Sequence, residues 1–547
     1  MAFRFAWAIA PLLCCCVVCG QSPMDHGSAA TKPAMHLPGM GNSNHPIATP
    51  NREAQEFFNQ GMNLLYGFNH DEAVRAFERA AQLDPKSPMP PWGKALALGP
   101  NINMDVDPKA EFAAWEAEQA ALRLATGDVP EAERDYVHAL AQRYSNDAKA
   151  DLKKLGHDYA DAMRMLSHKY PDDLDAATLF AESLMDLNPW RLWTSDGQPA
   201  PGTTEIVEVL EGVLRRDPQH LGANHYYIHT MEASKHPEVA LSSADRLAKL
   251  APAAGHLVHM PGHIYLQLGD YSTTASTNEA AADADRKYVA KTGAQGIYPA
   301  MYYTHNLHFL AVARAGQGRY IEAKKAADQM ARNVEPMIKE MPILEAFAVI
   351  TRLIDIQFAK WNVVLKQTEP TKESVMYPLW LYGRVLAFSA KGQIDEAQTA
   401  HATLEKIAAN MPADVPFGTT NMAKPVMELA AAIASASVLD AKHETDAAIN
   451  KWRDAARLQD AMSYDEPPVW YYPVRQSYGG ALLRAKRDAE AEIVFREALD
   501  QHPRDGRLLY GLLESLKRQH KPGADIIERE FQQAWKGAEI KLSIADL

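Results

Sequence analysis

Cysteine is scarce in this 547-residue chain and is confined to its start. The first 20 residues, MAFRFAWAIAPLLCCCVVCG, contain all of it, at Cys14, Cys15, Cys16 and Cys19. One early arginine followed by an apolar run is typical of a secretory signal peptide, here with a cleavage site after Gly20. Cleavage there would leave a mature chain without cysteine, which excludes disulfides and thiolate metal sites.

Long hydrophobic runs are also missing after this segment. No later run is long and apolar enough to span a bilayer, so we expect a periplasmic or secreted protein with no membrane span. A lipid anchor on Cys19 is the alternative, although Val18 is a poor match to the small residue that a lipobox has before its cysteine.

Positive charge is in deficit: 56 Lys and Arg face 69 Asp and Glu, for a formal net charge of -13. This balance argues against nucleic acid and against anionic membrane surfaces as partners. The sequence also has no phosphate-binding glycine motif, no Gly-x-Ser-x-Gly elbow and no His-Glu-x-x-His. The enzyme classes that depend on these motifs therefore lose support.

Residues 21–50 are rich in Pro, Gly, Ser and Ala and have no helical period, which predicts a disordered arm. The arm carries methionines and histidines at Met24, His26, Met35, His36, Met40 and His45. Thioether and imidazole groups suit copper. These phrases resemble the Met/His-rich segments of periplasmic copper-resistance proteins, which implies copper capture. A linker with incidental Met and His is the other interpretation.

From residue 51 onward the hydrophobic pattern predicts α-helix almost throughout. The phrase FNHDEAVRAFERAAQLDP (68–85) resembles the second helix of a tetratricopeptide repeat, including its closing proline. Similar closing prolines and Gly-x-Tyr turns recur at Pro218, Pro252, Pro503, Gly269 and Gly318. Counting back from these landmarks puts the starts of first helices at Leu174, Leu221, Gly255 and Thr304.

The resemblance to the tetratricopeptide-repeat (TPR) superfamily implies an all-α, right-handed α-solenoid of helix pairs whose first helices line a groove. We expect an N-terminal solenoid with this groove over 51–333 and C-terminal helical repeats over 334–547. Residues 188–203 interrupt the pattern with turn-forming residues, so we expect a loop there that covers the groove.

Seven histidines gather in three short clusters within this N-terminal part: His225, His229, His256, His259, His263, His305 and His308. Their spacings of three and four, with Glu232 continuing the first cluster, put neighbours on one helix face. Helix-spaced histidines can present two imidazoles to one metal. In the register that the resemblance implies, all seven face the groove, together with Glu182 and Asp186.

These ten residues are therefore the candidate metal ligands, for one or two ions of zinc, iron or copper. The hypotheses are a metal-dependent protein or enzyme, a non-catalytic copper-binding and delivery protein, and a metal-free scaffold that binds a small molecule or peptide. Whether the protein is an enzyme stays open. Pro261 predicts either a kinked helix through His256, His259 and His263 or a helix that begins at Pro261.

Overall fold

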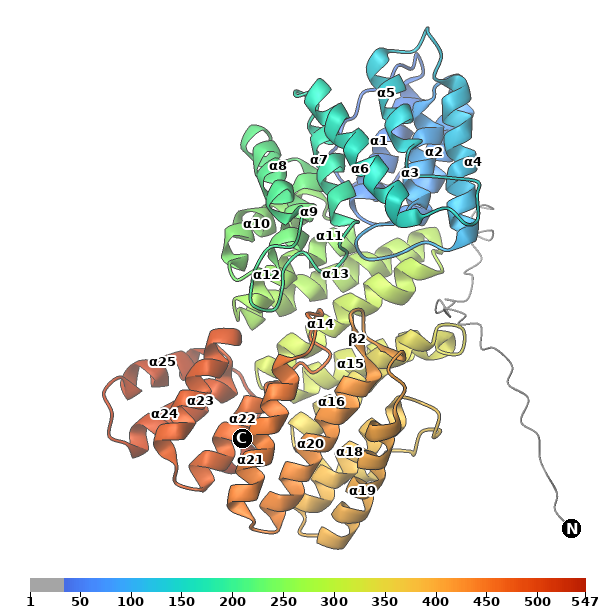
Figure 1. Ribbon diagram of the computed structural model, residues 1–547. Helices are drawn as coiled ribbons and strands as arrows, with labels where there is room; N and C mark the ends of the chain where they lie inside the picture. The colour runs from blue at the N-terminus through green and yellow to red at the C-terminus, as the bar shows by residue number, and fades with distance from the viewer. Residues whose placement is uncertain (1–33) are drawn as a thin grey trace, which may run out of the picture.

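The structure is a computed structural model that describes residues 34–547, and helices joined by turns and several longer loops make up most of it (Figure 1). The expected signal peptide with its cysteines, and Met24 and His26 of the arm, lie outside the described residues. Over 34–547 no helix combines the length and the apolarity needed to cross a membrane.

The helices of the first half are α1 (Arg52–Tyr66), α2 (His70–Leu83), α3 (Met89–Leu98), α4 (Pro108–Leu124), α5 (Glu131–Leu140), α6 (Leu152–Lys169), α7 (Leu174–Met185), α8 (Thr203–Arg216), α9 (Leu221–Met231), α10 (Leu241–Leu250), α11 (Gly255–His259), α12 (Pro261–Gln267) and α13 (Tyr271–Thr292). Those of the second half are α14 (Tyr303–Gly316), α15 (Tyr320–Val334), α16 (Glu345–Gln357), α17 (Trp361–Lys366), α18 (Met376–Ala390), α19 (Ile394–Asn410), α20 (Ala423–Ala441), α21 (Thr445–Asp460), α22 (Val474–Arg484), α23 (Asp488–Gln501), α24 (Gly506–Arg518) and α25 (Ala524–Ala534). A small hairpin of β1 (Pro416–Phe417) and β2 (Asn421–Met422) precedes α20.

Helices that follow one another in the chain pack as pairs, and the pairs stack into an array. The turns inside pairs contain Gly269, Gly318 and Gly392 with φ near +70°, a conformation that glycine adopts without strain. The predicted first-helix starts at Leu174, Leu221 and Gly255 are those of α7, α9 and α11, and α14 begins one residue before Thr304. The chain is an all-α solenoid of tetratricopeptide-like helix pairs, as the sequence predicts.

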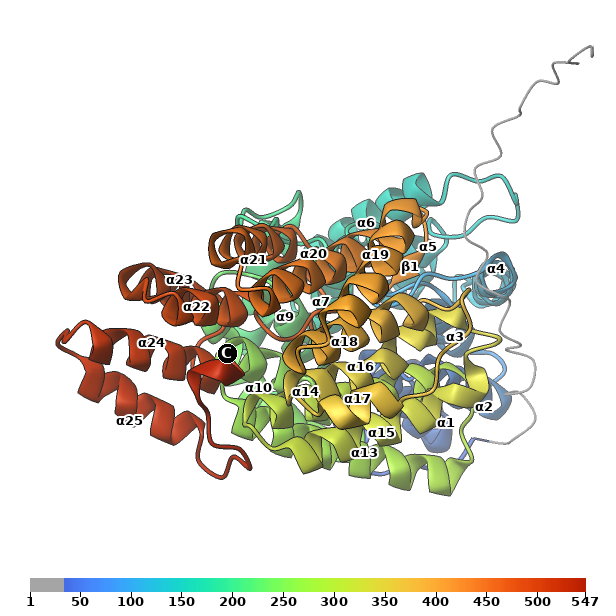
Figure 2. The ribbon, with the colours of Figure 1, turned by 90° about the horizontal axis from the view of Figure 1, so that it is seen from below.

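The buried hydrophobic residues form two main clusters, one running from Leu37 to Tyr302 and the other from Ala282 to Leu547. The clusters meet around α13 and α14, which lie between the two ends of the molecule (Figure 1). Figures 1 and 2 both show α24 and α25 on the side of the molecule away from α1 to α4. All the predicted histidines come from α9 to α14, so they lie near the junction of the two cores.

The arm differs from the prediction: residues 34–50 are ordered along α1. The backbone amides of Leu37, Ser43 and Ile47 donate to the side chains of Gln60, Asn63 and Gln55. These side-chain amides occupy one face of α1 and give an extended segment the partners that a strand would otherwise supply. The prediction of disorder overlooked this face, because composition alone carries no information about it.

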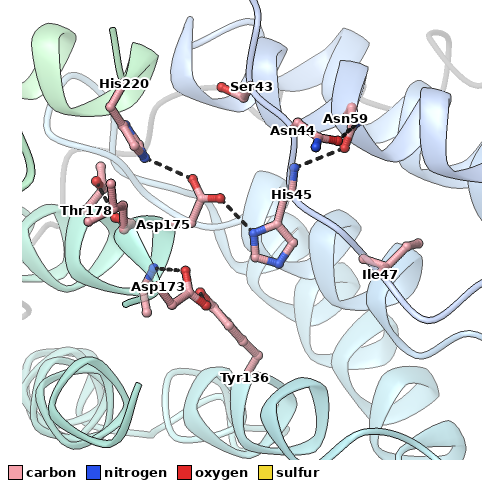
Figure 3. A network of polar contacts seen from close by, with 12 residues as sticks. Ser43, Asn44, His45, Ile47, Asn59, Tyr136, Asp173, Asp175, Thr178 and His220 are labelled. Atoms are coloured by element: carbon pink, nitrogen blue, oxygen red, sulfur yellow. Dashed lines mark hydrogen bonds and ion pairs between the residues drawn. The ribbon is translucent and has the colours of Figure 1, made fainter. Parts of the chain in front are cut away.

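His45 attaches the end of the arm to a distant helix. Its Nδ1 lies 2.8 Å from Oδ2 of Asp175, and the Asp175 carboxylate lies between His45 and His220 (Figure 3). Burial opposes a charged imidazole here, but the contact with Asp175 raises the pKa of His45. The arm is therefore part of the N-terminal core.

Pro261 divides the predicted histidine helix into two short helices. α11 ends at His259 and α12 begins at Pro261, where a proline costs no helical hydrogen bond. Met260 between them keeps helical dihedral angles, so His256 and His259 lie on a helix and not on a loop.

Candidate metal centre

α9, α11, α12 and α14 bring six of the seven predicted histidines into one continuous cluster. His225, His229, His256, His259 and His263 are each at most 3% exposed, whereas His305 is partly exposed. Neighbouring rings of the cluster lie 4.5–5.9 Å apart between centroids. In and around the cluster there are three groups of three residues, and within each group the possible ligand atoms lie within 4.8 Å of one another.

The first group consists of His225, His229 and His256. The Nδ1–H of His225 donates to the carbonyl oxygen of Tyr66 (2.6 Å), so its Nε2 carries a lone pair, and this atom lies 3.1 Å from Nε2 of His256. The Nδ1–H of His229 donates to Oε1 of Glu232 (2.9 Å), which leaves a lone pair on Nε2 there as well. Outer hydrogen bonds of this kind fix the tautomer and orientation of metal-binding histidines.

The second group consists of His259, His263 and His305. The side-chain amide of Asn278 donates to the carbonyl of Thr274 (2.8 Å), so its oxygen must accept the Nδ1–H of His259 (2.6 Å). Nε2 of His259 then presents a lone pair to Nε2 of His263, 2.6 Å away. The His305 ring completes the group at 4.7 Å from the His259 ring, between centroids.

The third group joins His263 to two carboxylates. Nδ1 of His263 lies 2.5 Å from Oε2 of Glu232 and also contacts Oε2 of Glu466. Glu466 follows α21, and the hydroxyl of Tyr464 donates to its other oxygen. No helical spacing connects Glu466 to the histidines, so no pattern in the sequence predicts that Glu466 lies beside them.

Several buried ligand atoms in these groups have no hydrogen-bond partner among the described residues. They are His229 Nε2 and His256 Nδ1, together with His263 Nδ1, Glu232 Oε2 and Glu466 Oε2, which contact one another as ion pairs but are not aligned for hydrogen bonds. A buried polar atom without a partner costs about 1–3 kcal/mol. Such a concentration of unpartnered atoms at one point is rare in folded proteins.

Burial keeps most of these imidazoles neutral. It lowers the pKa of His229 to about 3 and holds the pKa values of His225, His256 and His259 well below the ordinary 6.5, with neighbouring imidazoles adding to the effect. His263 is the exception. Burial opposes its charged form, but Glu466 and Glu232 outweigh this and raise its pKa to about 10. Burial and the nearby Glu232 raise the pKa of Glu466 to about 7.

Two phenylalanines form apolar walls around the cluster. Phe68 contacts the rings of His225, His229 and His256 at 4.6–5.7 Å, and Phe309 contacts those of the second group at 4.6–5.0 Å. Phe68 has a φ of 54° in the turn between α1 and α2. The turns before α13, α15 and α19 have glycine at this position, whereas those before α17, α21 and α23 have Ala359, His443 and Lys486, also with positive φ. A bulky residue adopts this conformation at a cost, so packing against the imidazoles must offset it.

The sequence matches no protein-family model and no curated protein. Solved structures with a similar fold include the human IFIT1 dimer with m7Gppp-AAAA, at 12% identity over 90% of this chain and 92% of that chain, with a TM-score of 0.33. They also include yeast Tom70, at 10% identity over 88% and 92% with a TM-score of 0.28, and the P58(IPK) TPR domain, at 12% over 88% and 99% with a TM-score of 0.23. Function must therefore be argued from the site.

Glu182 and Asp186 lie in a different cluster. Nη2 of Arg143 is 2.6 Å from Oδ2 of Asp186; Arg143 and Glu182 are buried, and the Asp186 side chain is 9% exposed. Burial raises the pKa of Asp186 to about 6, and burial with the neighbouring Asp186 raises the pKa of Glu182 well above its ordinary value, while Arg143 opposes both shifts. The structure brings neither carboxylate into a group with the histidines.

His308 also lies apart from the three groups. Its ring packs edge-on against Phe347 at 5.8 Å, and neither of its nitrogens has a hydrogen-bond partner. Its position three residues after His305 turns it about 60° around the helix, towards α16. Tyr302 contacts the His256 ring at 4.7 Å, whereas the hydroxyl of Tyr303 accepts a hydrogen bond from Gln329.

The covering loop reaches the first group. The indole N–H of Trp193 donates to the carbonyl of Thr230 (2.6 Å), which attaches residues 188–203 to α9. The Trp190 ring lies 6.3 Å from the His229 ring. The loop therefore stands beside His229.

A further group of ligand atoms, from His45, Asp173 and Asp175, lies in the pocket of about 520 Å³ under the arm. The carboxylates of this group already accept hydrogen bonds from protein groups. Asp173 accepts from Tyr136 and from the amide of Ala176, and Asp175 accepts from Tyr66 and lies against both His45 and His220 (Figure 3). This network attaches the arm and contrasts with the unpartnered atoms of the histidine cluster.

Proposed function

We propose that this protein is a metal-binding solenoid whose histidine cluster holds a transition-metal ion at His225, His229 and His256. The observation that carries the proposal is the arrangement of their nitrogens. Two rings have Nδ1–H committed to outer acceptors, which leaves Nε2 lone pairs directed into the group. Imidazole nitrogens presented in this way suit zinc, copper or iron.

The protonation state of these rings supports the same conclusion. A metal binds neutral imidazole, and binding normally competes with protons. Because burial lowers the pKa values of all three, the group is ready to accept an ion at neutral pH without releasing a proton.

Burial argues against the metal-free hypothesis in which the histidines form a groove for peptide carboxylates. A groove must expose its binding groups, yet five of the six clustered histidines are almost inaccessible. The copper-delivery hypothesis loses two of its four described ligands, since Met40 and His45 are buried in the N-terminal core, whereas Met35 and His36 are exposed. A resident ion is the function that these contacts favour.

A four-coordinate ion held by three protein ligands would keep one position for water, so activation of water is the enzymatic function to test against a metal store. Structural zinc sites use four protein ligands, whereas catalytic sites keep one position for water or substrate. In a catalytic site, azide added to the Co²⁺-loaded protein should change its visible absorption by entering this position. An unchanged spectrum would favour a closed, non-catalytic ion.

The primary test is the metal content of the full chain without a polyhistidine tag. We expect the protein to retain metal through gel filtration and His225→Gln with His229→Gln to lose the ion while keeping the helical circular dichroism spectrum. His236→Gln is the matched control, because this exposed histidine pairs only with Glu238 on the surface. Equal metal content in the double variant and the control would refute the proposal.

A further inference from the structure

The strongest remaining feature of the molecule is the contact of His263 with Glu232 and Glu466. It joins a ring on α12, a carboxylate at the end of α9, and a carboxylate on the segment between α21 and α22. All three side chains are at most 3% exposed, and the facing atoms Nδ1 and the two Oε2 make no hydrogen bond.

We propose that these three residues form a second metal subsite, specific for a divalent cation that accepts oxygen ligands, and that the ion joins the C-terminal repeats to the N-terminal solenoid. The inference extends the proposed function but uses its own ligands, His263, Glu232 and Glu466. Zn²⁺, Fe²⁺ and Mn²⁺ fit a set with two carboxylates and one imidazole, whereas Cu(I) does not.

Charge balance is the first argument for an ion. Two carboxylates buried side by side repel each other, and burial of an uncompensated charge is costly. One divalent ion with neutral His263 brings the group to zero net charge. While both carboxylates are ionised, a proton on His263 would leave one negative charge, and the single Nδ1–H could satisfy only one of the two oxygens that face it.

The tautomers give the second argument. Nε2 of His259 is an acceptor, since Nδ1–H of that ring donates to Asn278. In its neutral form His263 must therefore place its proton on Nε2 and donate to His259. Its Nδ1 then directs a lone pair at two carboxylate oxygens, an arrangement that either a proton on Nδ1 or a metal cation between the three atoms would stabilise.

The third argument is the support given to Glu466. Tyr464 donates to its free oxygen, and Gln267 of α12 donates to the Tyr464 hydroxyl at 3.1 Å. Asp465 accepts from the backbone amides of Thr419 and Thr420, which attaches the same segment to the β1–β2 hairpin. Outer-shell contacts of this kind hold metal ligands in position.

The test measures zinc and manganese bound by the full chain after chelator treatment and reloading with Zn²⁺ or Mn²⁺ alone. We expect the wild-type chain to bind two zinc ions and Glu466→Gln to bind one, with Mn²⁺ entering only the wild type. Glu530→Gln, an exposed carboxylate on α25, is the control. Limited proteolysis should show the 461–473 segment protected by metal in the wild type and unprotected in Glu466→Gln.

The outcomes separate this inference from the proposed function. Two zinc ions retained by Glu466→Gln, or one ion bound by wild type and variant alike, would overturn the second subsite and leave the first in place. Loss of all metal binding in the wild type would overturn both. If Glu466→Gln does not fold, Tyr464→Phe serves as the second variant, because it keeps the Glu466 carboxylate but removes the hydroxyl that supports it. This variant should weaken one of the two zinc affinities by about 10-fold or more. An unchanged affinity would again refute the subsite.

Discussion

Proton release during zinc binding should distinguish the two subsites. At pH 7 the metal-free protein holds a proton on His263, because Glu466 and Glu232 raise its pKa to about 10 in spite of burial. Zinc on Nδ1 of His263 must displace that proton. We expect the ion that needs Glu466 to release about one proton, plus a fraction from Glu466 itself, whose pKa is about 7.

The magnitude follows from the distance between pH and pKa. Removing a proton from a group about 3 units above the solution pH costs about 4 kcal/mol, at 1.36 kcal/mol per unit. The apparent affinity of this subsite should therefore rise about 10-fold per pH unit between pH 6.5 and 8.5. The subsite of His225, His229 and His256 should show no such slope from its ligands, because the pKa values of those rings lie below this range.

Isothermal titration calorimetry in buffers of different ionisation enthalpy gives the number of protons released. A metal-bound water can also lose a proton, so the quantity to compare is the difference between the wild type and Glu466→Gln. The same number of protons in both proteins would refute the assignment of His263. Without metal, the stabilisation that follows from the raised pKa of His263 should be lost as pH rises through about 10, and its ion pair with Glu466 should also weaken below about pH 7, where that carboxylate is protonated.

Three further measurements test other parts of the structure. Burial raises the pKa of Glu118 to about 9 and leaves both its oxygens without a hydrogen-bond partner among the described residues. The neutral carboxyl group costs no stability below about pH 4.5, but its ionisation destabilises the fold increasingly as pH rises. Between pH 5 and 7, the free energy of unfolding of Glu118→Gln in urea should therefore rise by about 2–3 kcal/mol relative to that of the wild type, and a constant difference would contradict this. His45→Ala should cost about 1–3 kcal/mol and make the arm sensitive to protease, whereas unchanged cleavage would show that His45 does not hold it. The pKa of His45 is raised, so its contribution should be complete below pH 6.5 and lost as pH rises through the folded value, which titration of its ring by NMR would check.

The sequence was sufficient to predict the helical array and the gathering of the histidines. Helix pairs leave local landmarks, so the prolines after α8 and α10 and the glycines of the turns give the register directly. Once the register is known, the starts of α7, α9 and α11 follow, and with them the facing positions of His225, His229 and His259. Neighbouring helices pack about 8–10 Å apart, which is close enough for imidazoles to meet.

The sequence was insufficient wherever a contact joins distant segments. Glu466 reaches His263 from a segment without helical spacing, and no local pattern encodes the path of that segment. Glu182 lies on the predicted face, but it pairs with Asp186 beside Arg143, a cation contributed by the turn after α5. A buried carboxylate goes to the nearest compensating charge, and helix register alone does not reveal where that charge lies.

The position of the cluster between two hydrophobic cores gives metal binding a structural consequence. A site built from one helix pair would stabilise only that pair, because each repeat of a solenoid contacts its neighbours alone. Here the first group joins α9 to α11, and the second subsite would join α9 and α12 to a segment beyond α21. Free energy from an ion at His263 would then be shared between repeats that are far apart in the chain. If so, metal should make the two ends of the array unfold together, and the chelated protein should unfold in separate steps.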